Sequence, residues 1–192
     1  MRVRLLLLRT ASKISNSCRS LSSQVDVFDR SLKRRQRESR FNLKERCDYD
    51  YLRQQSASGL VDRIEDISRS FPLALELGCD GGHVFDLINE KEGFDGVGGV
   101  GGIQTLIMCD NIPSSLQFCL DKSKGTAEKE SRVTAHGLLV DEEFLPFRDN
   151  HFDIVLSNLS LHWVNDLPSS LLQIKNCLKP DGVLLGDFGS TS

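Results

Sequence analysis

The segment formed by residues 141–182 limits the fold of this chain more tightly than any other part of the sequence. It contains an acidic loop, the apolar run FDIVLSN at Phe152–Asn158, a polar loop and an amphipathic stretch. Asp166 is the expected N-cap of a helix in that stretch, and Pro180 and Gly182 mark the end of the helix. A buried strand that is joined by a short loop to an amphipathic helix is the repeating unit of a parallel α/β sheet.

The same alternation of strand, turn and helix begins after Pro72. The expected strands are Leu73–Cys79, Leu106–Cys109, Val133–Val140, Phe152–Asn158 and Val183–Phe188, and the expected helices are Gly82–Asn89, Pro113–Leu120 and Asp166–Leu178. The predicted fold class is therefore α/β, with a doubly wound, mostly parallel, Rossmann-like sheet. The chain stops just past the fifth expected strand, so we expect a fold truncated after strand five, with an uncovered strand edge.

The two ends of the chain carry opposite charge. Residues 1–53 contain 14 Lys or Arg against 6 Asp or Glu, whereas residues 54–192 contain 10 against 21. Three segments are expected: a mitochondrial transit peptide at residues 1–24, a basic helical segment at residues 25–70 and a cofactor-binding domain at residues 71–192. The first segment is rich in Arg and Ser, and its apolar run Leu5–Leu8 is too short for a secretory signal or a membrane span. A disordered basic tail is the alternative interpretation.

Composition and cysteine content point to one ordinary globular domain in a reducing compartment. With 39% hydrophobic and 27% charged residues, the 192-residue chain suffices for a single core. The six cysteines form neither a CxxC pair nor a zinc-binding spacing, so we expect reduced thiols. No metal site is predicted.

Residues 26–69 carry apolar positions at helical spacing among many charges. The basic run Lys33–Arg37 suggests nucleic acid, but no aromatic residues are interleaved with it, and we expect no nucleic-acid partner. We favour a solvated helix face. A surface for docking on an acidic partner or on anionic inner-membrane lipid is the other possibility.

The stretch GFDGVGGVGG at residues 93–102 contains a formal GxGxxG at Gly96, Gly98 and Gly101. A dinucleotide-binding fingerprint follows a strand and opens a helix. No strand precedes this stretch and a strand follows it, so we interpret it as a flexible loop.

Polar residues and glycines gather where the expected strands end. The turn ELGCDGG follows the first strand, where glycines allow a ligand to approach the backbone and the next helix N-terminus attracts an anion. Asp110 ends the second strand and is placed to accept hydrogen bonds from two ribose hydroxyls, and Asp141 ends the third and is placed to hold an adenine amino group. Together these elements predict an S-adenosylmethionine site, the alternative being glycines that only pack a helix on the sheet and acids that are surface charges. The candidate cofactor-binding residues are Glu76, Gly78, Cys79, Asp80, Gly82, Asp110, Asn111, Asp141, Glu142 and Asn158.

The basic run and the segment after residue 141 together resemble a known family. FDRSLKRRQR from Phe28, FPLAL at residues 71–75, DEEFLPF, FDIVLSNLSLHWVNDLP and LKPDGV are similar to the mitochondrial complex I assembly factors of the arginine-hydroxylase type, which have a class I methyltransferase fold. The resemblance covers nearly all of residues 26–188. It implies a matrix protein, peripheral to the inner membrane, that hydroxylates an arginine on a core subunit of complex I.

Asp80 departs from the methyltransferase pattern, which usually has its middle glycine at this point of the turn. Asp tolerates a left-handed backbone better than most residues do, but it adds a negative charge close to the expected methionyl carboxylate. Cofactor affinity should therefore be reduced unless Gly81 lets the turn shift by one residue.

Three functions stay open at this point. The first is arginine hydroxylation during complex I assembly, for which the residues identify no oxidant. A triad of His151, Asp153 and His162 imitates an iron site, but a strand of about 20 Å separates its members. The second is methylation of a small molecule or a carrier protein, since carboxyl methyltransferases of biotin synthesis share the SNLxxxW pattern, and the third is a non-catalytic binding protein.

His162 and Trp163 are the candidate substrate-lining residues, because they follow strand four beside the expected methionine arm. An indole ring is suited to stacking on a guanidinium group. The alternative is that Trp163 wedges the following helix onto the sheet.

Overall fold

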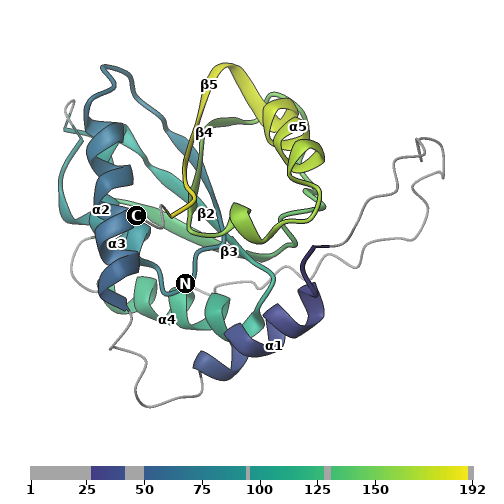
Figure 1. The fold of residues 1–192 in the computed structure, drawn as a ribbon. Coiled ribbons are helices and arrows are strands. Elements are labelled where there is room, and N and C mark those ends of the chain that lie inside the picture. The colour runs from purple at the N-terminus through teal and green to yellow at the C-terminus, as the bar shows by residue number, and fades with distance from the viewer. Residues whose placement is uncertain (1–26, 42–49, 94–95, 128–130, 190–192) are drawn as a thin grey trace.

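The computed structural model describes residues 27–41, 50–93, 96–127 and 131–189 (Figure 1). The expected transit peptide, Cys18 and Cys47 lie outside these ranges. The four described cysteines are buried free thiols, as expected.

A five-stranded sheet forms the centre of the fold. Its strands are β1 (Leu73–Leu77), β2 (Thr105–Asp110), β3 (Thr134–Leu139), β4 (Phe152–Asn158) and β5 (Leu178–Asp187). The strand order is β3-β2-β1-β4-β5 and each neighbouring pair is parallel, which confirms the predicted fold class. The order reverses between β1 and β4, so the carboxyl ends of these strands border the crevice where open α/β sheets bind ligands.

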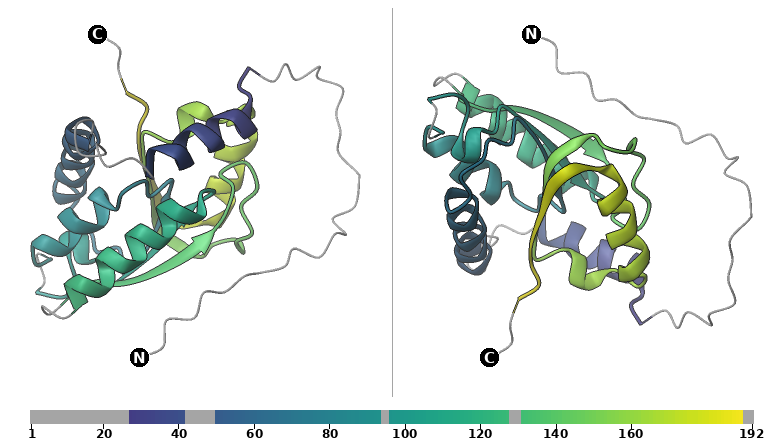
Figure 2. Two further views of the ribbon diagram at one scale, coloured as in Figure 1. Left: turned by 90° about the horizontal axis from the view of Figure 1, so that it is seen from below. Right: turned by 90° about the horizontal axis from the view of Figure 1, so that it is seen from above.

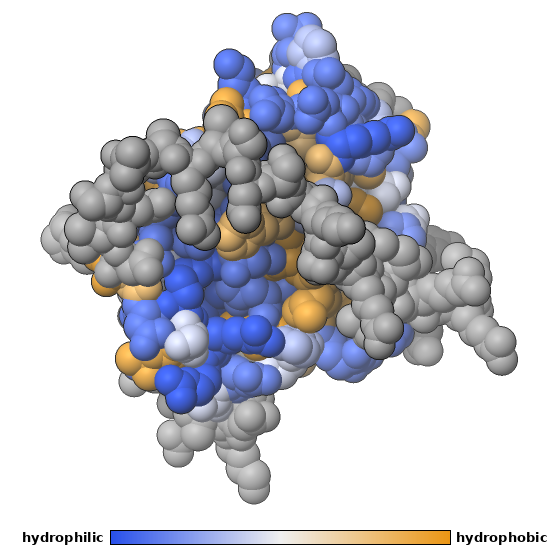
Figure 3. Space-filling model, turned by 90° about the vertical axis from the view of Figure 1, so that its right-hand side faces the viewer, coloured by the Kyte–Doolittle hydropathy of each residue, from blue (hydrophilic) through white to orange (hydrophobic). Residues whose placement is uncertain are grey.

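Helices cover the two faces of the sheet (Figure 1). On one face lie α2 (Asp50–Glu65), α3 (His83–Glu90) and α4 (Pro113–Ala127), and on the other lies α5 (Leu167–Cys177). Phe71 and Phe85 fill the first core and Phe152 the second, each at most 1% exposed. Burying a side chain of this size contributes about 1.5–3 kcal/mol. Hydrophilic side chains predominate on the face seen in Figure 3, with smaller apolar areas between them.

The predicted helices and strands differ from the observed ones mainly at their ends. Phe152–Asn158 was predicted with the observed bounds. The last strand, in contrast, begins at Leu178 rather than Val183, because Leu178 already pairs with Phe152 before the chain loops out and rejoins opposite Ile154. Asp181 supplies the left-handed backbone of that loop, with φ of 67°.

The glycine-rich stretch contains a packed element, so the flexible-loop prediction is wrong for its second half. Val100–Gly102 forms the 3-10 helix η2 and is buried against α2 and α3. A Cβ atom on Gly101 would lie 2.4 Å from Cγ2 of Ile64, which explains why glycine occupies this position. The Gly101 carbonyl also accepts a hydrogen bond of 2.8 Å from the amide of Phe71. Residues 94–95 lie outside the described ranges.

The basic helix α1 (Arg30–Phe41) is separate from α2 and packs beside α4 (Figure 2). It lies at the carboxyl edge of the sheet, where the sequence predicts the ligand site. Among the described residues, no helix is both long enough and apolar enough to cross a membrane.

Candidate functional site

The glycine turn between β1 and α3 has a backbone that few other sequences could adopt. Gly78, Gly81 and Gly82 have φ of 76°, 94° and 71°, in the left-handed region that favours glycine. A Cβ on Gly78 would lie 2.1 Å from Oγ of Ser160, so a side chain at this position would clash as well as strain the backbone. No side chain caps the N-terminus of α3, so its first amides stay open to an anion.

Asp80 does not leave an unpaired negative charge in this turn. Its Oδ2 accepts a hydrogen bond of 2.9 Å from Nε of Arg53 on α2. The carbonyl of Arg53 in turn accepts from Nδ2 of Asn158 at 3.1 Å, which ties α2 to the end of β4. The penalty expected for the missing glycine is thus offset by a cation that sequence reasoning did not identify.

Glu76 is an acid buried at the end of β1 without a full set of partners. It is 1% exposed, and its Oε2 has no hydrogen-bond partner among the described residues. Burial raises its pKa to about 8, and the negative charges of Asp110, Asp86 and Asp80 act in the same direction. At neutral pH the carboxyl group is therefore mostly protonated, and a cation brought beside it would favour its ionised form.

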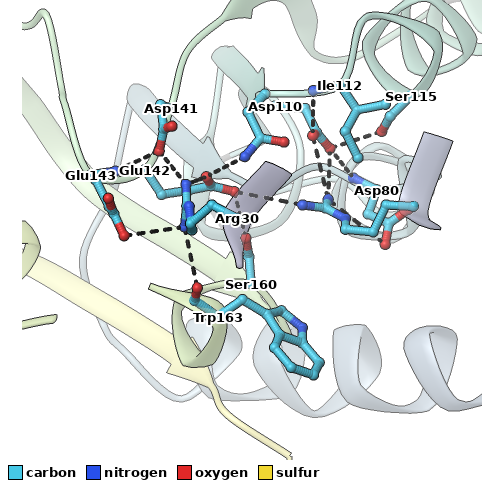
Figure 4. Close-up of polar contacts among 12 residues, drawn as sticks. Arg30, Asp80, Asp110, Ile112, Ser115, Asp141, Glu142, Glu143, Ser160 and Trp163 are labelled. Atoms are coloured by element: carbon cyan, nitrogen blue, oxygen red, sulfur yellow. Dashed lines mark hydrogen bonds and ion pairs between the residues drawn. The ribbon is translucent and has the colours of Figure 1, made fainter. Parts of the chain in front are cut away.

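Asp110 ends β2 and is fully buried (Figure 4). Its Oδ1 accepts from the amide of Ile112 at 3.0 Å, and its Oδ2 accepts from Oγ of Ser115 at 2.8 Å. Nη2 of Arg37, on α1, donates to the two oxygens at 3.4 and 3.2 Å. Burial raises the pKa of Asp110, although the Arg37 charge opposes this shift.

The acidic loop after β3 holds a second arginine of α1 (Figure 4). Arg30 forms ion pairs with Asp141, with Glu142 at 3.2 Å and with Glu143 at 3.6 Å. It also donates to the carbonyl of Trp163 at 3.3 Å. The carboxylates expected to face an adenine therefore face a guanidinium group in this structure.

Glu142 connects the ends of several strands. Its Oε1 accepts from Oγ of Ser160 after β4 at 2.8 Å, and its Oε2 accepts from Nδ2 of Asn111 after β2 at 3.1 Å. The Oδ1 of Asn111 is buried and has no partner among the described residues. The structure thus brings the predicted residues Asn111 and Glu142 together with Ser160.

The remaining predicted residues lie beside the same edge but make structural contacts. Oδ1 of Asn158 accepts from Oγ of Ser56 on α2 at 2.5 Å. Cys79 is buried in the core. The indole of Trp163 packs against the ring of Phe28 at 5.4 Å between centroids and has Nζ of Lys33 over its face at 3.6 Å. These contacts favour an anchoring role for Trp163.

His162 lies next to Trp163 on the 3-10 helix η3 (Leu161–Trp163). Burial lowers its pKa, and the charges of Arg37 and Lys33 act in the same direction. Asp153, a member of the triad that imitates an iron site, makes structural contacts: its carboxylate accepts from Nζ of Lys179 at 2.8 Å and from the amide of Leu73. The described residues contain no group of three His, Cys, Asp or Glu side chains that could hold a metal ion.

Sequence reasoning missed the cations Arg30, Arg37 and Arg53, and it was wrong to treat the whole basic run as a solvated face. Arg34 and Arg35 are exposed, but the Arg37 side chain is only 17% exposed. The sequence did contain a signal for Arg30 and Arg37. They are seven residues apart and so lie on the same face of a helix, and the basic first part of the chain is attracted to the acidic second part.

The residues present fit an S-adenosylmethionine site on one condition. The unpartnered oxygens of Glu76 and Asn111, the open start of α3 and the carboxylate of Asp110 are groups that an adenosyl amino acid requires. Arg37 already donates to both oxygens of Asp110, so ribose hydroxyls bind there only after Arg37 has moved.

Comparison with known proteins agrees with the fold. Residues 75–186 match a family described as methyltransferase domain. The chain belongs to this family. In agreement with the fold, it superposes on an S-adenosylmethionine-dependent methyltransferase from Aquifex aeolicus with a TM-score of 0.56 and 15% identity, over 74% of this chain and 68% of that one.

Curated relatives share more sequence with this chain. The chain is 41% identical over 175 residues to the mitochondrial arginine-hydroxylase NDUFAF5 of Danio rerio, which covers 90% of this chain and 49% of the relative. The human protein of the same name is 41% identical over 162 residues, covering 84% and 41%. The chain thus spans about half the length of these relatives. A malonyl-[acyl-carrier protein] O-methyltransferase of Halorhodospira halophila is 40% identical over 50 residues, 26% of this chain and 17% of that protein.

Proposed function

We propose that this methyltransferase-domain protein is a complex I assembly factor that hydroxylates an arginine on a core subunit of the mitochondrial enzyme. The observation that carries the proposal is the 41% identity over 90% of the chain to a mitochondrial arginine-hydroxylase. The basic helix α1 with the sequence FDRSLKRRQR belongs to the same resemblance. We also propose a location in the matrix, in peripheral contact with the inner membrane.

S-adenosylmethionine is the cofactor that we propose for the site. When bound, it supplies a sulfonium-activated methyl group, or in a hydroxylase serves as a bound adenosyl ligand. In this proposal Glu76 ionises and accepts hydrogen bonds from the methionyl ammonium, and the first amides of α3 hold the carboxylate; the buried carboxyl group of Glu76 and the N-terminus of α3 support these roles. Asp110 holds the ribose, and Asn111, Asp141 and Glu142 contact the adenine, a role supported by the hydrogen bond between Asn111 and Glu142.

Two roles of the surrounding residues follow from their contacts. Arg53 neutralises Asp80 beside the methionyl carboxylate, and so lowers the repulsion that this carboxylate would meet. Oγ of Ser56 lies 2.5 Å from Oδ1 of Asn158 and 2.6 Å from Oδ2 of Asp187 and donates its one proton to either of these acceptors, so α2 contacts the ends of β4 and β5.

The test is complementation of cells that lack their own mitochondrial arginine-hydroxylase. The full chain, or an Asp110→Asn variant of it, is expressed, and complex I subunits are examined by mass spectrometry for hydroxylated arginine. We expect restored hydroxylation and complex I assembly with the parent and neither with Asp110→Asn. Asp121→Asn, which changes an exposed aspartate of α4, is the matched control. Failure of both the parent and Asp121→Asn would overturn the proposal.

A carrier-protein methyltransferase is the second candidate, because the malonyl-carrier relative is 40% identical over 50 residues. Incubation with S-adenosylmethionine and malonyl-carrier protein distinguishes the two functions. A methyl ester on the carrier would support this second candidate, and hydroxylated arginine in cells would support the first.

A further inference from the structure

The two arginines that enter the site come from one face of one helix. Arg30 and Arg37 lie seven residues apart on α1, which is about two helical turns. Arg30 reaches the acidic loop after β3 (Figure 4). Arg37 reaches the end of β2. Helix α1 therefore crosses the carboxyl edge of the sheet as a strap that fills the proposed cofactor site with the protein's own cations.

The start of this strap is held by neutral contacts as well as by ion pairs. At its start the amide of Phe28 donates to Oδ1 of Asn165 at 2.8 Å, and Nδ2 of Asn165 donates to the carbonyl of Phe28 at 3.1 Å. The Phe28 ring also packs edge-on against Trp163. Beside these neutral contacts, Arg30 forms its ion pairs with the acidic loop at Asp141–Glu143, so this end is held by neutral and by charged contacts.

Further along the strap, charge supplies the contacts that reach the site. Arg37 lies 3.2 Å from Asp110, 3.9 Å from Glu142 and 4.0 Å from Asp80. Burial lowers the pKa of Arg37, but these carboxylates outweigh it, so the pKa lies above its ordinary value and the guanidinium stays charged. We call these ionic contacts of Arg37 with Asp110, Glu142 and Asp80 the latch. They form away from most solvent, where ion pairs are stronger than at the surface.

The latch and the ribose need the same two oxygens. Asp110 accepts from the amides of Ile112 and Asp80 and from Oγ of Ser115, and Arg37 donates to both of its oxygens. A carboxylate has about four acceptor positions, so Arg37 takes the position that the other three donors leave open, and a ribose hydroxyl is not accommodated while Arg37 is in place.

We propose that Arg37 is an internal competitor of the cofactor. In the free protein it occupies the ribose position on Asp110, and the cofactor binds by displacing the second half of α1, which swings about the anchor at Phe28. This inference rests on the proposed cofactor, and it adds a self-occupied state of the site. Arg37, which the free protein places over Asp110, becomes available for other contacts when the cofactor is bound.

Titration with S-adenosylhomocysteine tests the competition, since this ligand carries the adenosine and the amino acid but no sulfonium charge. Calorimetry compares the full chain with Arg37→Gln. Loss of the competitor should tighten binding about tenfold, equivalent to about 1.4 kcal/mol. Arg37→Lys keeps the charge but loses the planar two-donor geometry and should show a smaller gain. Arg35→Gln removes an exposed charge from the same helix and should bind as the parent does.

A readout that needs no ligand separates the latch from the cofactor proposal. Hydrogen exchange of the α1 amides should quicken in unliganded Arg37→Gln and Arg37→Lys, and in the parent when the ligand is bound. Tighter binding with faster exchange supports the proposal. Weaker or unchanged binding by Arg37→Gln would overturn it, as would unchanged α1 exchange in both Arg37 variants. If no protein binds the ligand but α1 loosens in the Arg37 variants, the latch stands and the cofactor assignment falls.

Discussion

Replacing Glu76 with Gln should stabilise this protein, and increasingly so as the pH rises. Folding raises the pKa of this carboxyl from 4.5 to about 8, mainly through burial. The folded state therefore binds the proton more tightly than the unfolded state does, and stability is lost as pH rises from the unfolded value through the folded one. One pKa unit is equivalent to about 1.4 kcal/mol, so ionisation of Glu76 should lower the unfolding free energy of the parent by about 4 kcal/mol between pH 5 and pH 9.

Urea denaturation at pH 5, 7 and 9 measures this difference directly. The gap in unfolding free energy between Glu76→Gln and the parent should widen with each step in pH, because glutamine cannot ionise. Glu90→Gln, which changes an exposed acid at the end of α3, should show no such widening. A gap that is the same at all three values would refute the assignment of Glu76 as a buried neutral acid.

Two further substitutions test the glycine turn. Arg53→Gln removes the 2.9 Å hydrogen bond to the carboxylate of Asp80, so it should lower the unfolding free energy by about 1–3 kcal/mol. Most of this loss should vanish when Asp80→Gly is added. Chemical denaturation of the parent, the two single variants and the double variant gives the coupling energy. Gly78→Ala should lower the melting temperature by more than about 5 °C, since its Cβ would lie 2.1 Å from Ser160 Oγ at a φ of 76°, and adding Ser160→Gly should restore only part because the backbone strain stays. If Arg53→Gln lost as much unfolding free energy in the Asp80→Gly background as in the parent, the role given to Arg53 would be contradicted. If Ser160→Gly restored the melting temperature of Gly78→Ala in full, the backbone strain assigned to position 78 would be contradicted.

The central strands β1, β2 and β4 were predictable from sequence because they are short, apolar and mostly buried. Phe152–Asn158 is buried along its whole length, and its run of apolar residues determines both ends. The glycine-rich stretch could not be interpreted in this way, because Gly101 is required by Ile64, 37 positions earlier in the chain. Packing between distant segments leaves no local pattern.

The acids of the site were predictable for the same reason, since each follows a recognisable strand. Their partners were not. Arg37 contacts Asp110 from 73 positions away, and Arg30 contacts Asp141 from 111 positions away. A basic run on a helix is usually solvated, so only the opposite charges of the two parts of the chain hinted that this helix would cover the acids.

Calorimetric titration of S-adenosylmethionine into the full chain and its Asp110→Ala variant tests the central claim most directly. The account predicts saturable binding at one site by the parent and by the control Asp121→Asn, and loss of binding by Asp110→Ala, whose side chain can no longer hold the ribose. Binding that survives in Asp110→Ala would place the cofactor elsewhere. Silence from the parent and from Arg37→Gln alike would show that this carboxyl edge does not bind the cofactor.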